Sequence, residues 1–132
     1  MGFPMNLIED NSLKVTEEGF EVKARLMWYR SLPLSCVEKV SVAIDGKTIE
    51  SQAILLGIND TAYPLDKLEE MVDQTWFVQD SARLIIQKPG MVSKGQKCQI
   101  VAEIVLRAPY IMVGPDKFLT MPTHYAASQV AS

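Results

Sequence analysis

The sequence predicts an all-β protein that folds as one antiparallel β-sandwich of the immunoglobulin-like type. Apolar and polar residues alternate with period two over residues 20–28 and 98–106, and an Asp-Gly pair stands between two further strand-like segments. About seven short strands separated by turn residues are typical of such sandwiches. The 132 residues suffice for one core. Strands and long helices do not alternate, which argues against a nucleotide-binding α/β fold.

The first long strand is expected over residues 20–28, after two short N-terminal strands. Its apolar residues share one parity and its charged residues the other, which indicates a half-buried strand. The apolar set is Phe20, Val22, Ala24, Leu26 and Trp28. By this parity Trp28 faces the core.

The next two strands are expected to form a hairpin around Asp45-Gly46. Val40, Val42 and Ile44 face inward before the turn. Asp-Gly favours a type I′ turn because both central residues need a positive φ. Residues 47–56 then return as the partner strand, with apolar contacts expected at Ile49, Ile54 and Leu56.

The middle of the chain leaves two readings open. Apolar residues at a spacing of three to four, namely Leu65, Leu68, Met71 and Val72, follow Pro64, which favours one or two helical turns. The acidic residues around them fit equally well on a loop that crosses between sheets.

Two later strands are expected in the last third of the sequence. Residues 82–87 read as a buried strand that ends at Lys88-Pro89-Gly90, a sequence suited to a type II turn. Residues 98–106 show the cleanest alternation, and Pro109 is expected to end that strand because proline lacks a ladder donor. We expect residues 1–112 to form the sandwich. Residues 113–132 are expected to form an extended C-terminal arm, at an interface or partly disordered.

Composition and charge exclude several classes of function. Thirteen Lys and Arg are scattered against sixteen Asp and Glu, with a net charge of −3, so no phosphate-binding groove is expected and no nucleic-acid partner. No signal-peptide pattern or apolar run of about 18 residues is present, so we expect a cytoplasmic protein without a membrane partner. Cys36 and Cys98 have no CxxC spacing and are expected to be buried free thiols.

No motif points to catalysis or metal binding on this chain. Glycine-rich phosphate loops are absent, and His124 is the single histidine. It lies in a proline-flanked segment without an evident orienting partner, which favours an exposed or interface histidine over a base. We therefore predict no catalytic residue, no metal and no cofactor on this chain.

Two groups of residues are candidates for contact with a partner or a substrate. The first is Trp28, Tyr29, Arg30, Leu32 and Pro33, because Trp, Tyr and Arg dominate interface hot spots. The competing reading, that Trp28 is a core indole, stays open. The second is Tyr110, Met112, Phe118, His124 and Tyr125. An irregular segment with such residues either wraps its own sandwich or docks on another subunit, and we expect docking.

A family resemblance adds a function to this picture. The segment WYRSLPLSCVEKVSVAIDG, residues 28–46, and the later RAPYI, residues 107–111, resemble the small (β) subunit of bacterial C-glycoside deglycosidases. The resemblance covers residues 6 to 112.

The resemblance implies that this chain is the non-catalytic half of a carbon–carbon lyase acting on 3-oxo-C-glycosides. Its partner would be a large α subunit similar to the sugar-isomerase barrels, with a divalent metal, expected to be manganese, and a histidine base. A ketone at C3 acidifies the C2 proton, whose removal allows the aglycone to leave by β-elimination.

Two rival functions come from other classes. A stand-alone sandwich would bind carbohydrate by stacking a sugar on an exposed indole such as Trp76. An independent enzyme would use His124 as its base. Activity of the pure chain that is lost in His124→Ala would favour that second rival.

Overall fold

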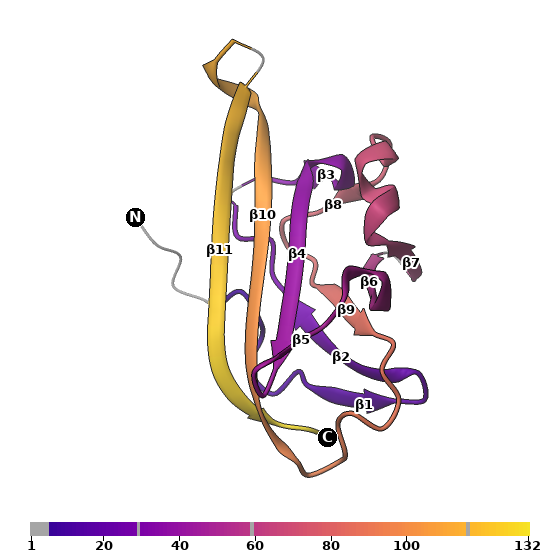
Figure 1. Ribbon diagram of the computed structural model, residues 1–132. Coiled ribbons are helices and arrows are strands. Elements are labelled where there is room, and N and C mark those ends of the chain that lie inside the picture. Colours follow the sequence, from indigo (N-terminus) through magenta and orange to yellow (C-terminus); the bar gives the residue numbers. More distant parts are fainter. Residues whose placement is uncertain (1–5, 29, 59, 116) are drawn as a thin grey trace.

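The structure is a computed structural model that describes residues 6–28, 30–58, 60–115 and 117–132. A five-stranded and a four-stranded antiparallel sheet enclose one apolar core, and a two-stranded pair lies beside them (Figure 1). The all-β antiparallel class is therefore confirmed. The immunoglobulin-like type stays a prediction, since the strand order alone does not test it.

The five-stranded sheet has the order β1-β2-β9-β6-β7. Its strands are β1 (Lys14–Thr16), β2 (Gly19–Ala24), β9 (Ala82–Ile86), β6 (Ile54–Ile58) and β7 (Thr61–Pro64). The buried face of β2 carries the predicted apolar parity, with Phe20 and Val22 almost fully covered. Strand β9 is buried along most of its length, as predicted for residues 82–87. The sheet therefore combines one alternating strand with strands that are mostly apolar and buried.

The four-stranded sheet has the order β11-β10-β4-β5. Its strands are β4 (Val37–Ile44), β5 (Lys47–Thr48), β10 (Lys97–Gly114) and β11 (Lys117–Val130). Between β4 and β5 both turn residues have a positive φ, 50° at Asp45 and 83° at Gly46, as a type I′ turn requires. Gly90, with a φ of 80°, likewise fits the predicted type II turn.

The predicted single return strand over residues 47–56 is wrong. Strand β5 ends at Thr48, a 3-10 turn η2 (Ser51–Ala53) follows, and β6 then lies in the other sheet. Ile49 and Ile54 are both buried, although they have opposite parity. In one unbroken strand, residues of odd and even number point to opposite faces of the sheet. Both isoleucines can be buried because the strand ends between them and the chain passes to the other sheet.

The segment between β7 and β9 contains a short helix. Residues Leu65–Glu70 form the 3-10 helix η3, which buries Leu68 and leaves Val72 exposed. Further short elements flank it: β3 (Leu32–Pro33), η1 (Leu34–Cys36) and β8 (Thr75–Trp76), with β3 paired to β8. The helical reading of the middle segment is confirmed.

The first long strand is shorter than predicted, because β2 ends at Ala24. Leu26 is still buried, but Trp28 is only half-buried and lies outside any strand. The prediction that Trp28 belongs to the inner face of a strand is therefore wrong, although its half-buried side chain still packs against the core.

The extended arm expected after Met112 is instead a sheet strand. Strands β10 and β11 pair from Lys97–Val130 to Gly114–Lys117, with irregular register between Ala108 and Gly114. The end of this hairpin rises beyond the other strands (Figure 1). Polar inward positions such as Gln129 hid the alternation of β11.

Pro109 does not end β10, contrary to the prediction. Asp45 N donates to Gln99 O, and Gln99 N donates to Asp45 Oδ1, so the odd residues of β10 direct their backbone groups toward β4. Pairing with β4 stops at Leu106–Val37. A backbone N–H at position 109 would point to the side of β10 where no strand lies beyond Leu106. Proline at this position therefore costs no hydrogen bond between strands.

Candidate functional site

Three of the predicted site residues come together at the base of the projecting hairpin. Trp28 Nε1 donates a hydrogen bond to the hydroxyl of Tyr110, and Arg30 Cζ lies 4.8 Å from the centroid of the Tyr110 ring. A guanidinium at this distance from a ring makes a cation–π contact. We call these three residues the aromatic clamp, because they join the loop after β2 to strand β10.

Beyond the clamp lies the hairpin end, residues 111–118. Its described residues Met112 and Phe118 are cross-strand partners, 59% and 37% exposed, and Val113 is 61% exposed. Such exposed apolar side chains at a projecting end are typical of protein contact surfaces. The prediction that Met112 and Phe118 contact a partner stays a prediction.

A groove lies beside the hairpin end on the outer face of the four-stranded sheet. It measures about 590 Å³ and is lined by Glu38, Arg107, Val113, Lys117, Phe118, Leu119 and Thr120. Arg107 Nη1 lies 3.5 Å from Glu38 Oε2, and Arg107 Nη2 donates to Ser35 O at 3.1 Å. The groove therefore combines apolar walls with a fixed ion pair.

The other predicted site residues lie elsewhere. Leu32 and Tyr125 are buried in the core of this chain, 2% and 6% exposed, so their side chains do not belong to its surface, contrary to the expectation for interface residues. Pro33 is half-buried in β3. Tyr29 lies outside the described residues.

His124 lies on the outer face of the four-stranded sheet, away from the aromatic clamp. Its Nε2 is 3.4 Å from Glu103 Oε2, while Lys39 Nζ is 3.0 Å from Glu103 Oε1. The sequence showed no partner for this histidine, because the two residues meet only through the register of β10 and β11. The side chain of His124 is 69% exposed, which fits a surface histidine.

Trp76 is fully buried, and its Nε1 donates to Asp80 O at 2.9 Å. The rival function of a stand-alone carbohydrate-binding sandwich needs an exposed indole, and this one is not exposed. An aromatic side chain that stacks on a sugar must face solvent to meet the ligand, so Trp76 does not provide such a site.

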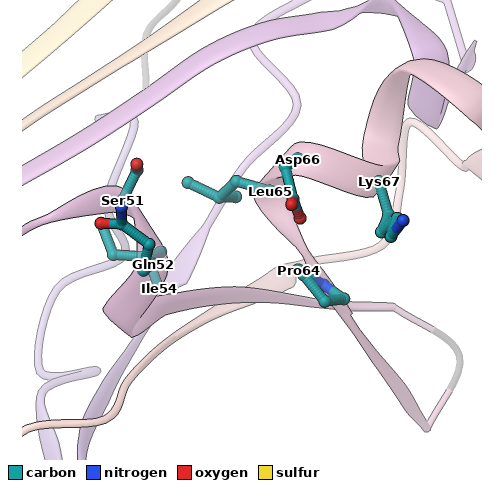
Figure 2. A pocket seen from close by; sticks show the side chains of 7 residues that line it. All are labelled: Ser51, Gln52, Ile54, Pro64, Leu65, Asp66 and Lys67. Atoms are coloured by element: carbon teal, nitrogen blue, oxygen red, sulfur yellow. The ribbon is translucent and has the colours of Figure 1, made fainter.

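A second hollow lies between η2 and η3 (Figure 2). It measures about 450 Å³ and is lined by Ser51, Gln52, Ile54, Pro64, Leu65, Asp66 and Lys67. Figure 2 shows Leu65 pointing toward Ser51 and Gln52, and the carboxylate of Asp66 directed toward Pro64. Sequence analysis missed this hollow, because exposed polar residues next to turns carry no distinguishing pattern.

Among the described residues, two titratable groups have a shifted pKa. Burial, followed by the nearby Asp45 charge, raises the pKa of the Cys98 thiol. The hydrogen bond from Lys88 lowers the pKa of the exposed Glu50 carboxyl. Cys36 and Cys98 are both free and buried, which confirms the prediction for the thiols.

The described part of the chain holds neither a cluster of metal-binding side chains nor a membrane-spanning helix. Residues 6–28, 30–58, 60–115 and 117–132 contain no group of three or more His, Cys, Asp or Glu placed to hold a metal ion. Within the same ranges no helix has the length and hydropathy needed to cross a membrane.

Comparison with known proteins places the chain in a family. The C-glycoside deglycosidase beta subunit family matches residues 3–110. A 3'-dehydrocarminate deglycosidase beta subunit from Microbacterium sp is 33% identical over 84% of this chain and 83% of its own length. A C-glycoside deglycosidase beta subunit from Microbacterium trichothecenolyticum is 28% identical, over 88% and 87%. One from Arthrobacter globiformis is 26% identical, over 86% of both chains. With most of its length covered by these matches, the chain belongs to the C-glycoside deglycosidase beta subunit family.

Proposed function

We propose that this chain is the non-catalytic small subunit of a C-glycoside deglycosidase that cleaves the carbon–carbon glycosidic bond of 3-oxo-C-glycosides. Its partner would be a large barrel-fold α subunit, in a cytoplasmic hetero-oligomer. Family membership carries the proposal, since the relatives are named as beta subunits. The name of one relative, 3'-dehydrocarminate deglycosidase, describes an oxidised substrate.

The proposed reaction is a β-elimination. The C3 ketone acidifies the C2–H bond, a histidine base of the large subunit takes the C2 proton, and C1=C2 forms as the C1–aglycone bond breaks. The electron pair of that bond passes to the aglycone, which takes up a proton. A divalent metal of the large subunit, proposed to be manganese, would stabilise negative charge on the ketone oxygen.

The part played by this chain is to bind and complete the large subunit. Of the nine large apolar side chains that are exposed among the described residues, seven lie around β3 and β8 or on β10 and β11 from the clamp to the hairpin end. These are Val72, Phe77, Val78, Tyr110, Met112, Val113 and Phe118. These segments share the upper part of Figure 1. Apolar exposure concentrated at one end of a small protein supports a docking surface there.

Co-expression with the large subunit tests the proposal. Metal-dependent cleavage of a 3-oxo-C-glycoside should require both chains. The double variant Arg30→Ala/Tyr110→Ala should co-purify less large subunit and lose activity in proportion, because truncating interface hot spots typically costs more than about 1 kcal/mol each. The matched control Lys47→Ala/Val130→Ala removes an exposed cation and an exposed apolar residue at the other end. Unchanged assembly and activity in Arg30→Ala/Tyr110→Ala would contradict the proposal that this surface docks on the large subunit.

One observation favours a second function, a stand-alone carbohydrate-binding module. The hollow of Figure 2 offers a hydroxyl, an amide, a carboxylate and an ammonium group around the apolar side chains of Ile54, Pro64 and Leu65, and sugars are recognised by such mixtures. Calorimetric titration of the isolated chain with glycosides separates the two functions. Saturable binding without a partner, lost in Asp66→Ala, favours the module.

A further inference from the structure

A small pocket lies beside the aromatic clamp, between the segment after β2 and the turn that precedes β9. It measures about 240 Å³ and is lined by residues 25–28 and 78–81. Trp28 belongs both to this pocket and to the clamp, and the exposed Val78 belongs both to the pocket and to the proposed docking surface. The pocket therefore borders the surface on which the large subunit is proposed to dock.

Hydrogen bonds to the surroundings hold the wall that the turn provides. Val78 N donates to Ser31 Oγ at 2.8 Å, which ties the turn to the loop after β2. The turn itself is closed by a bond from Asp80 N to Phe77 O and by a second bond from Trp76 Nε1 to Asp80 O, both 2.9 Å long. The pocket is thus preformed, as small-molecule sites usually are, and a ligand does not have to order this wall on binding.

The lining combines one aromatic ring with polar groups that can bind hydroxyl groups. The half-buried indole of Trp28 is held in place by the hydrogen bond from its Nε1 to Tyr110. Arg25 uses Nη1 to bind Asn6 O at 2.8 Å, and a guanidinium carries five N–H donors in all. The amide of Gln79 adds donors and an acceptor. This set of groups suits a flat ring that carries hydroxyl substituents.

The size of the pocket and the proposed reaction limit what this ring can be. Sites for drug-sized ligands measure about 300–1,000 Å³, so this smaller pocket has room for a single ring. In the proposed reaction the sugar ring must lie among the metal and the base of the large subunit, which leaves the aglycone for this chain. The aglycone must also accept the electron pair of the broken bond. An aromatic ring with hydroxyl groups can do so, because its oxygen atoms take up the charge.

We propose that this pocket binds the hydroxylated aromatic ring of the aglycone, stacked on Trp28 and held by hydrogen bonds from Arg25 to its phenolic oxygen atoms. The inference rests on the proposed function and assigns a part of the substrate site to this chain, while the metal and the base stay with the large subunit. The small subunit then contributes to substrate specificity as well as to assembly, because an aglycone without hydroxyl groups loses the contact with Arg25.

Chemical-shift mapping by NMR on the isolated chain tests the pocket, with phloroglucinol, a trihydroxylated benzene ring, as the probe. We expect saturable shifts of the Trp28 indole N–H and of the backbone amides of residues 78–81, with a Kd of about 1 mM. Trp28→Leu should weaken binding about fivefold and Arg25→Gln about tenfold. Gln79→Ala should weaken it about threefold and changes only an exposed side chain, so the fold and the clamp stay intact. The matched control Lys23→Gln removes an exposed cation of β2 outside the lining and should keep the native affinity.

Three results would overturn the assignment on the isolated chain. They are the absence of saturable shifts, shifts centred on the hollow of Figure 2, and tighter binding of methyl glucoside than of phloroglucinol. In the assembled enzyme, Arg25→Gln should raise the KM for a phenolic 3-oxo-C-glycoside about tenfold, with a smaller effect on kcat, and an unchanged KM also overturns the assignment. If no assembly forms, the proposed function fails, whereas the shift mapping still decides whether this pocket binds a phenol.

Discussion

Gln129 is a buried polar side chain, 7% exposed, that joins the last strand to the N-terminal segment. Its Oε1 accepts hydrogen bonds from Ser12 N and Leu13 N, both at 3.0 Å. Its Nε2 donates to Glu9 O at 2.9 Å and to Tyr125 Oη at 3.0 Å. The amide thus has partners for both its oxygen and its nitrogen, as a buried amide requires.

Gln129→Leu should lower the free energy of unfolding by about 2–4 kcal/mol, because two backbone N–H groups lose their acceptor in a closed space. Urea unfolding of the isolated chain measures the change. Gln99→Leu is the matched control: Gln99 is exposed and its side chain accepts a surface hydrogen bond from the Ser128 hydroxyl, so the effect should stay within about 0.5 kcal/mol. Equal effects in the two variants would contradict the role of Gln129.

Gly19 permits a close approach between backbones. Its φ is 153°, and a Cβ added there would lie 2.2 Å from Ile86 O and 2.5 Å from Lys88 N. Both atoms belong to the backbone of the neighbouring sheet strand or its turn, so neither can move aside cheaply. Gly46 has a φ of 83° but no atom within 4 Å of such a Cβ.

Gly19→Ala should therefore destabilise the chain more than Gly46→Ala. We expect a loss of about 3 kcal/mol or failure to fold for the first, from overpacking and strain, and about 1 kcal/mol for the second, from strain alone. Thermal unfolding, or the soluble yield where Gly19→Ala does not fold, gives the comparison. A larger loss in Gly46→Ala would contradict the steric argument.

Strand β11 forms one edge of the four-stranded sheet. Ala131 N donates to Gln96 O, and Gly95 N donates to Ala131 O, so odd residues of the C-terminal strand face β10 and even residues face the open edge. Pro122 is an even residue. Its missing N–H interrupts the row of free donors along that edge, which hinders pairing with a strand from another molecule.

Pro122→Thr should promote self-association of the isolated chain by completing this row of donors. Analytical ultracentrifugation over a concentration series would show dimers or larger species that the native chain lacks. Thr120→Val changes another exposed residue of the same edge without adding a backbone donor, and should leave the chain in its native state of association. If both variants associate, the cause is the changed side chain and not the added backbone N–H, and the prediction is contradicted.

Strands with one solvent-exposed face and one buried face were predictable from the sequence. Strands β2, β4 and the first part of β10 each alternate apolar and polar residues, and β9 is a short, mostly apolar strand; the buried residues of all four match the prediction. Strand β11 was not predictable, because Thr123 and Gln129 occupy inward positions while Phe118 and Val130 face outward. Hydrogen bonds to Gln129 replace apolar burial there, and a hydropathy pattern does not record them.

The candidate site was predictable in its residues and not in its geometry. Trp28, Arg30 and Tyr110 stand out by residue type, since such residues dominate interfaces. That the phenol of Tyr110 meets the indole of Trp28 depends on how β10 is placed relative to the loop after β2. This placement is a property of the whole sheet, and no local pattern contains it.

At the scale of the whole molecule, the proposed docking surface and the core are separate regions. The buried residues form one cluster, to which both large sheets contribute side chains. Most of the exposed apolar residues lie toward one end. The subunit should consequently fold alone and gain stability when its partner covers that end.

Assembly with the large subunit should raise the melting temperature of this chain by several degrees. Binding at a hundredfold excess over Kd adds about 2.7 kcal/mol, and 1 kcal/mol corresponds to about 2–8 °C for a domain of this size class. Hydrogen exchange followed across a temperature series in the complex would separate this chain from its partner. An unchanged melting temperature in a complex that demonstrably forms would contradict docking through the apolar end.

The contact between Gln129 and the N-terminal segment has a consequence for biosynthesis. Glu9 and Gln129 are 120 positions apart, and Ser132 N donates to Leu13 O while Val15 N donates to Ser132 O. A ribosome makes the N-terminal partners of these bonds first and the C-terminal partners last, so the sandwich cannot close before residues 129–132 have been synthesised. The final form of the clamp and hairpin must follow that closure, so the proposed docking surface would be complete only after residue 132 has left the ribosome.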